Sequence, residues 1–337
     1  MHLGLHTFAA LPDPDGPRSA TGAEAVAGLL ARVERAEAAG LHHFGIGEHH
    51  RAEFLDSAPH VLLAAAAART SRIRLTSAVT VLSAADPVRA FQNYAAVDLV
   101  SGGRAEMVVG RGSFTEAFPL FGYGFDDYDA LFEEKLGLLL RLRDEERVTW
   151  SGRFRPPLRD QGVYPRPAQA KLPIWVGVGG TPQSFVRAGT LGLPLMVAII
   201  GGEPHRFAPL VDLYREAGRR AGHNEATLRV GVHAIGYVGV DDLSAREAFF
   251  PGYRRQFSRI GRERGWGAVT REHFDAVSGP TGALVVGGPE EVATKIRHYD
   301  EVLGGLDRFS LQMDTGDLTQ AQYLDAVARL GALQAVV

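Results

Sequence analysis

Short apolar runs alternate with longer amphipathic stretches along almost the whole chain of 337 residues. The apolar runs have the length and the β-branched content of buried strands, whereas most of the longer stretches space their apolar residues as helices do. Strands that alternate with helices in this way predict a parallel sheet with helices outside it. Eight strands are predicted, at residues 2–8, 41–48, 72–82, 104–110, 172–179, 193–200, 228–239 and 307–314.

Helix start and stop signals follow most of these strands. The helix predicted at 22–40 ends at Gly40, the residue type expected just past a helix C-terminus, and the helix at 86–103 begins with Asp86 as cap and Pro87 in its first turn. Eight strand–helix units without a break in composition favour one (β/α)8 TIM barrel over residues 1–337. A doubly wound sheet is the main alternative, but it would usually show a linker or a second domain.

Two stretches are longer than ordinary barrel loops. Residues 144–172, with "RVTWSGRFRPPL" and "VYPRPAQAKLP", predict a hairpin insertion. Residues 251–287, with "GRERGWG" and "SGPTGALVVGG", predict an irregular lid or flap. A proline-rich loop is expected between the first strand and the first helix.

Composition narrows the possible functions. The net charge is −3, from 36 basic and 39 acidic residues, and no basic cluster supports a nucleic-acid or membrane-surface role. The absence of cysteine excludes disulfides, thiolate metal ligands and a cysteine nucleophile. The N-terminus has no signal-peptide pattern and the apolar runs are too short to span a bilayer, so we expect a cytoplasmic protein.

The stretch "GIGEHHRAEF" (45–54) follows the second strand. Side chains alternate along a strand, so Phe44 and Ile46 are expected to pack outward on helices, while His49 comes at the carboxyl end, where barrel active sites lie. A histidine there can exchange protons near neutral pH. A metal site is disfavoured because adjacent histidines point apart, and a pair of loop-bonded histidines is the simplest alternative.

Three further strand ends carry weaker signals. In "VVGRGSF", Gly110 and Gly112 flank Arg111, whose planar fork suits phosphate, although an arginine in a surface loop is the alternative. In "LTSAVTVLSAADPVR", the small residues Ser77 and Ala78 leave room for a flat ligand.

The fourth strand end is "WVGVGGTPQSF". Its Gly177, Gly179 and Gly180 do not make a dinucleotide fingerprint, because Pro182 stands where the third glycine belongs. Instead, Thr181 can cap a helix whose free amides receive an anion, although an ordinary capped turn explains the same residues.

Together these segments, with "GGPEEVATKI" near the C-terminus, resemble the bacterial luciferase-like flavin monooxygenase family over nearly the whole chain. The resemblance implies a (β/α)8 barrel that binds FMN, or in some branches a deazaflavin, at its C-terminal mouth. It also implies homodimers or homotetramers, although no segment identifies an interface.

The resemblance assigns roles residue by residue. His49 matches the histidine linked to the family's flavin intermediate, and Arg111 matches the arginine that binds the flavin phosphate. The bond between Ala78 and Val79 matches a non-proline cis peptide beneath the flavin ring. The phosphate turn corresponds to Gly179, Gly180 and Thr181, with Ser184 and the neighbouring Gly110 and Gly177 as further cofactor-binding residues.

The implied activity is a two-component monooxygenase that uses O2 and reduced FMN, supplied by a separate reductase, on a small organic substrate. Glycine replaces the luciferase cysteine before Arg111, and Gly180 replaces an acidic residue, so light emission does not follow. A deazaflavin-dependent dehydrogenase, a non-catalytic flavin-binding protein and a metal-dependent hydrolase are the alternatives, in that order.

Overall fold

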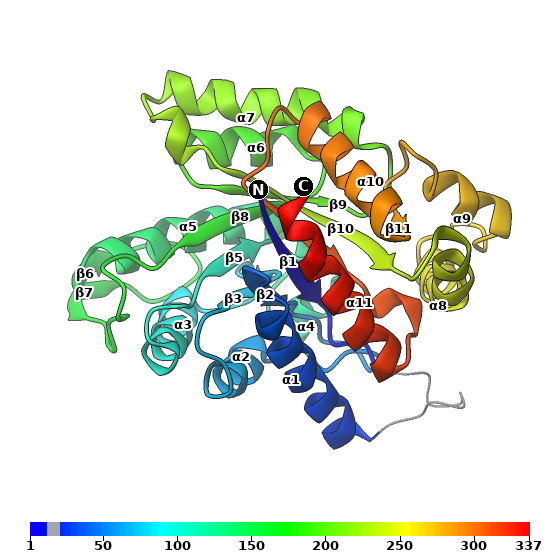
Figure 1. Ribbon diagram of the computed structural model, residues 1–337. Coiled ribbons are helices and arrows are strands. Elements are labelled where there is room, and N and C mark those ends of the chain that lie inside the picture. The colour runs from blue at the N-terminus through cyan, green and yellow to red at the C-terminus, as the bar shows by residue number, and fades with distance from the viewer. Residues whose placement is uncertain (12–20) are drawn as a thin grey trace.

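Parallel strands form the centre of the computed structural model, which describes residues 1–11 and 21–337 (Figure 1). The strands follow the order β3-β2-β1-β12-β10-β9-β8-β5-β4, and β11 pairs with β10. Because β3 and β4 are consecutive pieces of one chain segment, the two ends of this order meet and the sheet is a nearly closed barrel. The predicted (β/α)8 barrel is confirmed. The barrel strands are β1 (His2–Thr7), β2 (His43–Ile46), β3 (Arg74–Ser77), β4 (Thr80–Val81), β5 (Met107–Gly110), β8 (Ile174–Val178), β9 (Leu195–Ile199), β10 (Val230–Val238), β11 (Val285–Gly287) and β12 (Arg308–Gln312).

The first and last strands of the chain are neighbours. Leu5 of β1 is in register with Phe44 of β2 on one side and with Leu311 of β12 on the other. The two termini therefore lie close together, and the side chain of Gln334 bonds to Leu3 N and Met1 O at 2.8 Å each (Figure 1).

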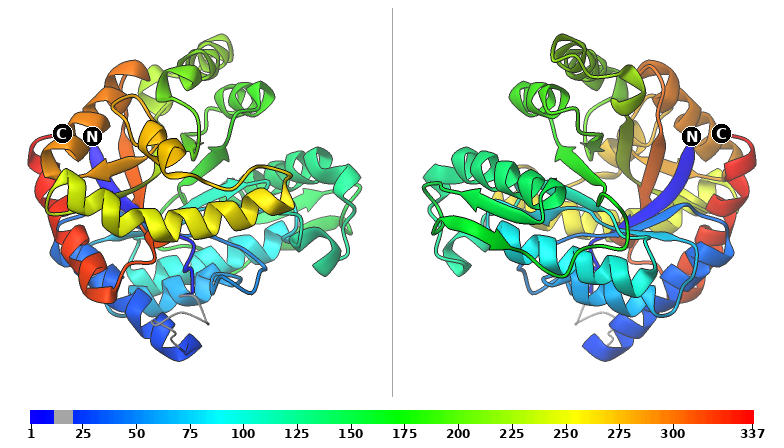
Figure 2. Two further views of the ribbon diagram at one scale, coloured as in Figure 1. Left: turned by 90° about the vertical axis from the view of Figure 1, so that its right-hand side faces the viewer. Right: turned by 90° about the vertical axis from the view of Figure 1, so that its left-hand side faces the viewer.

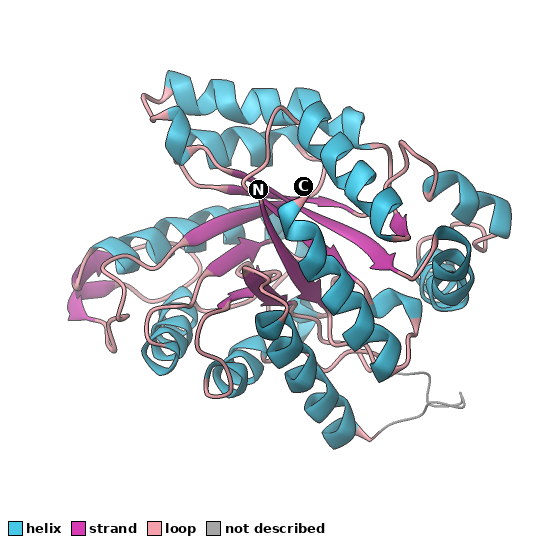
Figure 3. Cartoon of the chain, viewed as in Figure 1, coloured by secondary structure: helices cyan, strands magenta, loops and turns pink. Residues whose placement is uncertain are grey.

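Helices surround the barrel (Figure 3). Thr21 and Glu24 form a capping box at the start of α1, and Asp86 accepts hydrogen bonds from Val88 N and Arg89 N at the start of α3, as its predicted capping role requires. The helices are α1 (Gly22–Ala38), α2 (Pro59–Ala67), α3 (Pro87–Ser101), α4 (Ala117–Leu120), α5 (Tyr128–Asp144), α6 (Pro182–Thr190), α7 (Ala208–Arg220), α8 (Asp242–Glu263), α9 (Arg271–Val277), α10 (Pro289–Val302) and α11 (Gln320–Ala332). Short 3-10 turns cover Phe125–Asp127, Pro204–Phe207, Glu225–Thr227, Asp314–Gly316 and Leu333–Ala335.

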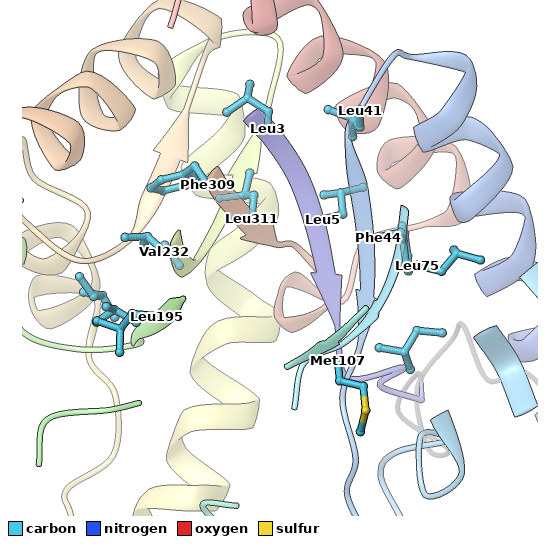
Figure 4. Close-up of a cluster of buried hydrophobic side chains, with 14 of the residues drawn as sticks. Leu3, Leu5, Leu41, Phe44, Leu75, Met107, Leu195, Val232, Phe309 and Leu311 are labelled. Carbon is cyan, nitrogen blue, oxygen red and sulfur yellow. The ribbon is translucent and has the colours of Figure 1, made fainter. Parts of the chain in front are cut away.

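The hydrophobic core is a shell between the strands and the helices rather than the centre of the barrel. Alternate residues of most strands belong to this shell, and Leu5, Phe44 and Leu75 are fully buried in it (Figure 4). Ile46 belongs to the same shell, in agreement with the outward packing predicted for Phe44 and Ile46. The intervening residues face the barrel interior, where many of them are polar.

A buried ion pair lies at the N-terminal end of the barrel interior. Arg308 Nη1 is 2.8 Å from Glu106 Oε2, and Arg74 bonds the other carboxylate oxygen. The guanidinium of Arg308 also stacks over Trp175, 3.9 Å from the ring centroid. Burial alone would raise the pKa of the Glu106 carboxyl, but the two arginines outweigh it and hold that pKa at about 2.

Two segments interrupt the barrel pattern. Within residues 144–172, β6 (Arg147–Trp150) and β7 (Leu158–Gly162) form an antiparallel hairpin at the edge of the molecule (Figure 3). The prediction of an irregular segment from residue 251 was wrong, because α8 continues through Pro251 to Glu263. Packing from distant parts of the chain maintains this helix despite its proline: a Cβ on Gly252 would lie 2.3 Å from the backbone of Gly316.

The proline-rich loop predicted after the first strand falls mostly on residues 12–20, outside the described part of the chain. In the described part, none of the helices combines the length and the apolar character needed to cross a membrane.

Candidate functional site

The strands open at their C-terminal ends into a cavity of about 1000 Å³. Ligand sites of TIM barrels lie at this end, and the volume is at the upper limit of ordinary small-molecule pockets. Two predicted residues, Gly180 and Ser184, are outside the cavity lining. The predicted residues that line it are His49, Ala78, Val79, Gly110, Arg111, Gly177, Gly179 and Thr181.

Arg111 is the centre of an anion-binding arrangement at one side of the cavity. Its Nη2 lies 3.3 Å from Thr181 Oγ1 and 3.2 Å from Ser184 Oγ, and its Nη1 contacts the carboxylate of Asp129. The guanidinium lies over the ring of Tyr128, 4.9 Å from its centroid, at a distance that allows a cation–π interaction. The structure thus brings a cation and two hydroxyl groups together, from residues 70 or more positions apart.

Thr181 occupies the N-cap position of α6, with Pro182 in the first turn, as predicted. The prediction that its side chain caps the helix was wrong, because that hydroxyl accepts a bond from Arg111 and makes no capping bond. Pro182 has no N–H and Ser184 N donates to the Thr181 carbonyl at 3.0 Å, so Gln183 has the first-turn amide that is left to meet an anion at this helix N-terminus. A Cβ on Gly179 or Gly180 would meet nothing within 4 Å, so the approach to this amide is open.

The two residues that connect β3 and β4, Ala78 and Val79, bulge into the cavity. The bond between Ala78 and Val79 is cis, as the family resemblance implies. Gly110 and Gly177 face this bulge: a Cβ on either would lie 2.8 or 2.6 Å from the Val79 side chain. These two glycines, predicted to bind the cofactor, line the cavity and also make room for Val79.

Glu48 connects the bulge to the loop after β2. Its Oε2 accepts a bond from Val81 N at 3.0 Å, and its Oε1 lies 3.3 Å from His50 Nε2. The carboxylate therefore links the backbone just after the cis bond to the histidine pair. The sequence pattern did not indicate this role of Glu48.

His49 is held by a carboxylate that the sequence did not single out. Asp56 Oδ2 lies 2.7 Å from His49 Nδ1, and Asp56 Oδ1 accepts the backbone N–H of His49 at 3.1 Å. Burial raises the pKa of the Asp56 carboxyl, and the hydrogen bonds from His49 oppose that rise. Since a carboxylate only accepts, Nδ1 carries the ring proton and Nε2 is the nitrogen left for proton exchange.

Aromatic rings surround this histidine on several sides. The ring centroid of Phe8 lies 4.3 Å from that of His49, Phe54 lies at 4.8 Å and Phe114 at 5.4 Å. Such walls keep water away from the ring and strengthen polar interactions beside it.

Asp56→Asn is expected to reverse the tautomer of His49. The asparagine can keep its oxygen toward the backbone N–H, which turns its NH2 group to the ring and makes Nδ1 an acceptor. Ring 15N shifts of histidine-labelled protein at neutral pH report the change: Nδ1 is protonated in the parent and Nε2 in the variant. An Nδ1 proton retained in the variant would contradict the assignment, and the shifts of distant His223 serve as the control.

Helix α8 covers part of the cavity mouth (Figure 2). At its C-terminal end Glu263 pairs with Arg51 of the loop after β2, at 2.5 Å between Oε1 and Nη2, and Arg259 pairs with Glu53 at 2.6 Å. Arg264 Nη2 lies 3.2 Å from the carbonyl oxygen of Ser113. Two loops of the barrel mouth are thus attached to the same helix end.

The described residues 1–11 and 21–337 contain no group of three or more histidine, aspartate or glutamate side chains that could hold a metal ion. The two histidines of the opening motif have separate partners, Asp56 and Glu48.

Comparison with protein families matches residues 3–305 to a family model described as luciferase-like monooxygenase. An uncharacterized protein of Sinorhizobium fredii is 33% identical over 168 residues, 49% of this chain and 47% of its own length. N-acetyl-S-alkylcysteine monooxygenase of Bacillus subtilis is 29% identical over 188 residues, 54% of each chain. The chain thus aligns with about half the length of these curated relatives.

Solved structures extend the likeness over the full chain. Monooxygenase RslO1 from Streptomyces bottropensis has a TM-score of 0.85 at 26% identity and covers 99% of both chains. The fold is also that of the oxygenating constituent of 3,6-diketocamphane monooxygenase from Pseudomonas putida, in complex with FMN (TM-score 0.77, 18% identity, 98% and 96% covered). An F420-dependent secondary alcohol dehydrogenase shares it as well (0.75, 18%, 98% of each chain).

Proposed function

The chain belongs to the luciferase-like monooxygenase family, and from this premise we propose that it is a two-component monooxygenase that uses reduced FMN and O2 on a small organic substrate. A separate flavin reductase supplies the reduced cofactor. The observation that carries the proposal is the convergence of Arg111, Thr181 and Ser184 at the start of α6. A single phosphate there would meet a guanidinium, two hydroxyls and the N-terminus of α6.

The cavity suits the remainder of such a cofactor. Its volume of about 1000 Å³ leaves space for a second, smaller molecule beside a flavin. The Ala78–Val79 bulge offers an apolar surface for one face of a flat ring. When bound, FMN supplies the activation of O2, a chemistry that the side chains of this protein lack.

The residues of the chain have distinct parts in this proposal. Arg111, Thr181 and Ser184 bind and orient the phosphate. His49 gives or takes a proton at Nε2, and Asp56 positions the ring by holding Nδ1–H. The aromatic side chains around His49 exclude water during the reaction.

A dehydrogenase that transfers hydride with a deazaflavin is the second candidate. Structures related to this chain include both an FMN complex and an F420-dependent enzyme, so the family uses either cofactor. The glutamate–histidine–histidine sequence at 48–50 favours the FMN branch. The His49–Asp56 pair supports an enzyme over a flavin carrier, because a carrier has no need of an oriented proton donor.

Titration of the purified protein with FMN, anaerobically reduced FMN and F420 tests the proposal. We expect reduced FMN to bind most tightly and Arg111→Ala to weaken that binding about 10- to 100-fold, because the variant loses charged hydrogen bonds to the phosphate. Fluorescence quenching or calorimetry gives the dissociation constants directly.

Arg187→Ala is the matched control, because Arg187 is on the same helix α6 but pairs with Glu133 outside the cavity. It is expected to leave FMN affinity unchanged. Preference for F420 would move the function to hydride transfer, and equal losses in both variants would remove the phosphate site from Arg111.

A further inference from the structure

The floor of the cavity carries polar side chains that the proposed cofactor site does not use. His6 on β1, His233 on β10 and Gln312 on β12 all line the cavity and are almost wholly buried. In the strand order, β12 lies between β1 and β10, and it is four strands away from β5 in either direction around the barrel when β3 and β4 are counted as one strand. The floor residues therefore stand on the wall opposite β5, which Arg111 directly follows.

Hydrogen bonds around Asp314 fix which atoms of the floor are free. Asp314 accepts bonds from Thr7 Oγ1 at 2.7 Å, Phe8 N at 2.8 Å and Gln312 Nε2 at 2.9 Å. Because the amide nitrogen of Gln312 faces this carboxylate, its oxygen faces His233 Nε2, 2.9 Å away. His233 therefore carries its proton on Nε2 and keeps a lone pair on Nδ1.

His6 has no polar partner at all within the described residues. Both ring nitrogens are buried without a hydrogen bond, although its ring packs against that of His233 at 4.8 Å. Burial lowers the pKa of His6 well below its usual value, and the neighbouring His233 and Arg308 lower it further. A neutral imidazole with two free nitrogens offers one donor and one acceptor, and leaving both unmade in the interior costs stability.

The side chains of His6, His233 and Gln312 carry no charge, and the charged group bonded to them is the Asp314 carboxylate beside Gln312. Burial also lowers the pKa of His233, to about 4, so both histidines are neutral at physiological pH. Higher in the cavity, the acid groups already have partners: Glu48 is bonded to Val81 and His50, and Glu116 to Arg51. The walls above are largely aromatic, with Phe8, Phe54, Phe114, Tyr253, Phe257 and Trp266.

We propose that this floor recognises the substrate, and that the substrate is an uncharged aromatic molecule with a hydroxyl group. The hydroxyl donates its proton to Nδ1 of His233 and accepts a hydrogen bond from the N–H of His6, which supplies the partner that His6 lacks. Aromatic walls stack on the ring system. Calling the bound molecule a substrate rests on the proposed function, whereas the binding site itself does not depend on that function.

Three bicyclic probes of similar size test the recognition on the full-length protein without cofactor: 2-naphthol, 2-methylnaphthalene and 2-naphthoate. We expect 2-naphthol to bind about tenfold or more tightly than either of the others. The methyl group of 2-methylnaphthalene cannot form hydrogen bonds with the two histidines, and the carboxylate of 2-naphthoate brings a charge into the buried floor. Equal binding of 2-naphthol and 2-methylnaphthalene would overturn the proposal. Preference for 2-naphthoate would overturn its neutral chemistry.

His6→Leu separates recognition from a structural role. The substitution removes two buried ring nitrogens that have no hydrogen-bond partner, so the melting temperature should rise. The affinity for 2-naphthol should fall about tenfold, and the affinity for 2-methylnaphthalene should stay unchanged or increase. His6→Gln retains a donor and an acceptor and should restore most of the affinity. His60→Leu on α2, outside the cavity, is the control. Unchanged 2-naphthol affinity in folded His6→Leu would refute the role of His6.

Failure of this inference can be told apart from failure of the proposed function. Arg111→Ala should leave 2-naphthol binding intact while it weakens FMN binding. If no flavin binds but the order of the three probes is as expected, the function is wrong and the floor is right. If Arg111→Ala weakens FMN binding but the three probes bind equally well, the proposed function is supported and the proposal for the floor is wrong.

Discussion

Replacement of His49 by glutamine is expected to lower turnover about 10²- to 10⁴-fold, the usual effect of removing a positioned general acid or base. The glutamine can still reach Asp56 but has no ionisable nitrogen to exchange a proton. His49 belongs to the loop after β2, away from the Arg111 cluster, so FMN affinity should change less than about twofold. Product formation under steady-state conditions and FMN titration measure the two effects separately.

His60→Gln provides the comparison, because it makes the same change on α2 outside the cavity. Its turnover should equal that of the parent. Turnover of His49→Gln close to the parent value would remove His49 from the reaction. A parallel loss of FMN affinity would make it a cofactor ligand instead.

The second large effect is on stability. Glu106→Gln is expected to reduce the free energy of unfolding at pH 7 by about 3–5 kcal/mol, because it leaves Arg308 buried without its counter-charge. Denaturant unfolding followed by circular dichroism measures the difference. Glu216→Gln removes an exposed carboxylate that pairs with Arg219 and Arg220, and it should have almost no effect.

The same substitution has a predictable pH dependence. The folded pKa of Glu106 is about 2, below its ordinary value of 4.5, so the stability gained from the charged carboxylate is complete above pH 4.5. It is lost as the pH falls toward 2, where the carboxylate becomes protonated also in the folded protein. The difference between parent and Glu106→Gln should therefore shrink from pH 4.5 to pH 2. A constant difference over this range would show that packing, and not charge, causes the loss.

The barrel could be predicted from the sequence because strand and helix periodicities are local properties. Each strand contributes an apolar face to the shell, as Leu3 and Leu5 do in β1, and a helix cap such as Asp86 is recognised from the few residues that follow it. By contrast, the length of α8 depends on Gly252 packing against the chain near Gly316, 64 positions later. Local signals at Pro251 therefore predicted a break that distant contacts prevent.

Part of the candidate site was accessible in the same way. His49 and Arg111 stand directly after strands, where the barrel brings every such residue to one mouth. Asp56 was missed because it lies in an irregular loop between β2 and α2. Nothing in "RAEFLDSAP" distinguishes it from an aspartate exposed to solvent. His6 and His233 were missed because β1 and β10 are far apart in the sequence. Only the closure of the barrel places them on either side of β12, on the same wall.

The separation between an apolar shell and a polar interior has a consequence for how this protein can change over evolutionary time. The shell holds the helices on the strands, whereas the polar residues that line the cavity, such as His6, His233 and Gln312, are not part of it. Mutations at such positions can accumulate with small effects on folding, so new specificities can arise without compensating changes elsewhere. A library restricted to these positions should retain a larger folded fraction than one of equal size drawn from the shell.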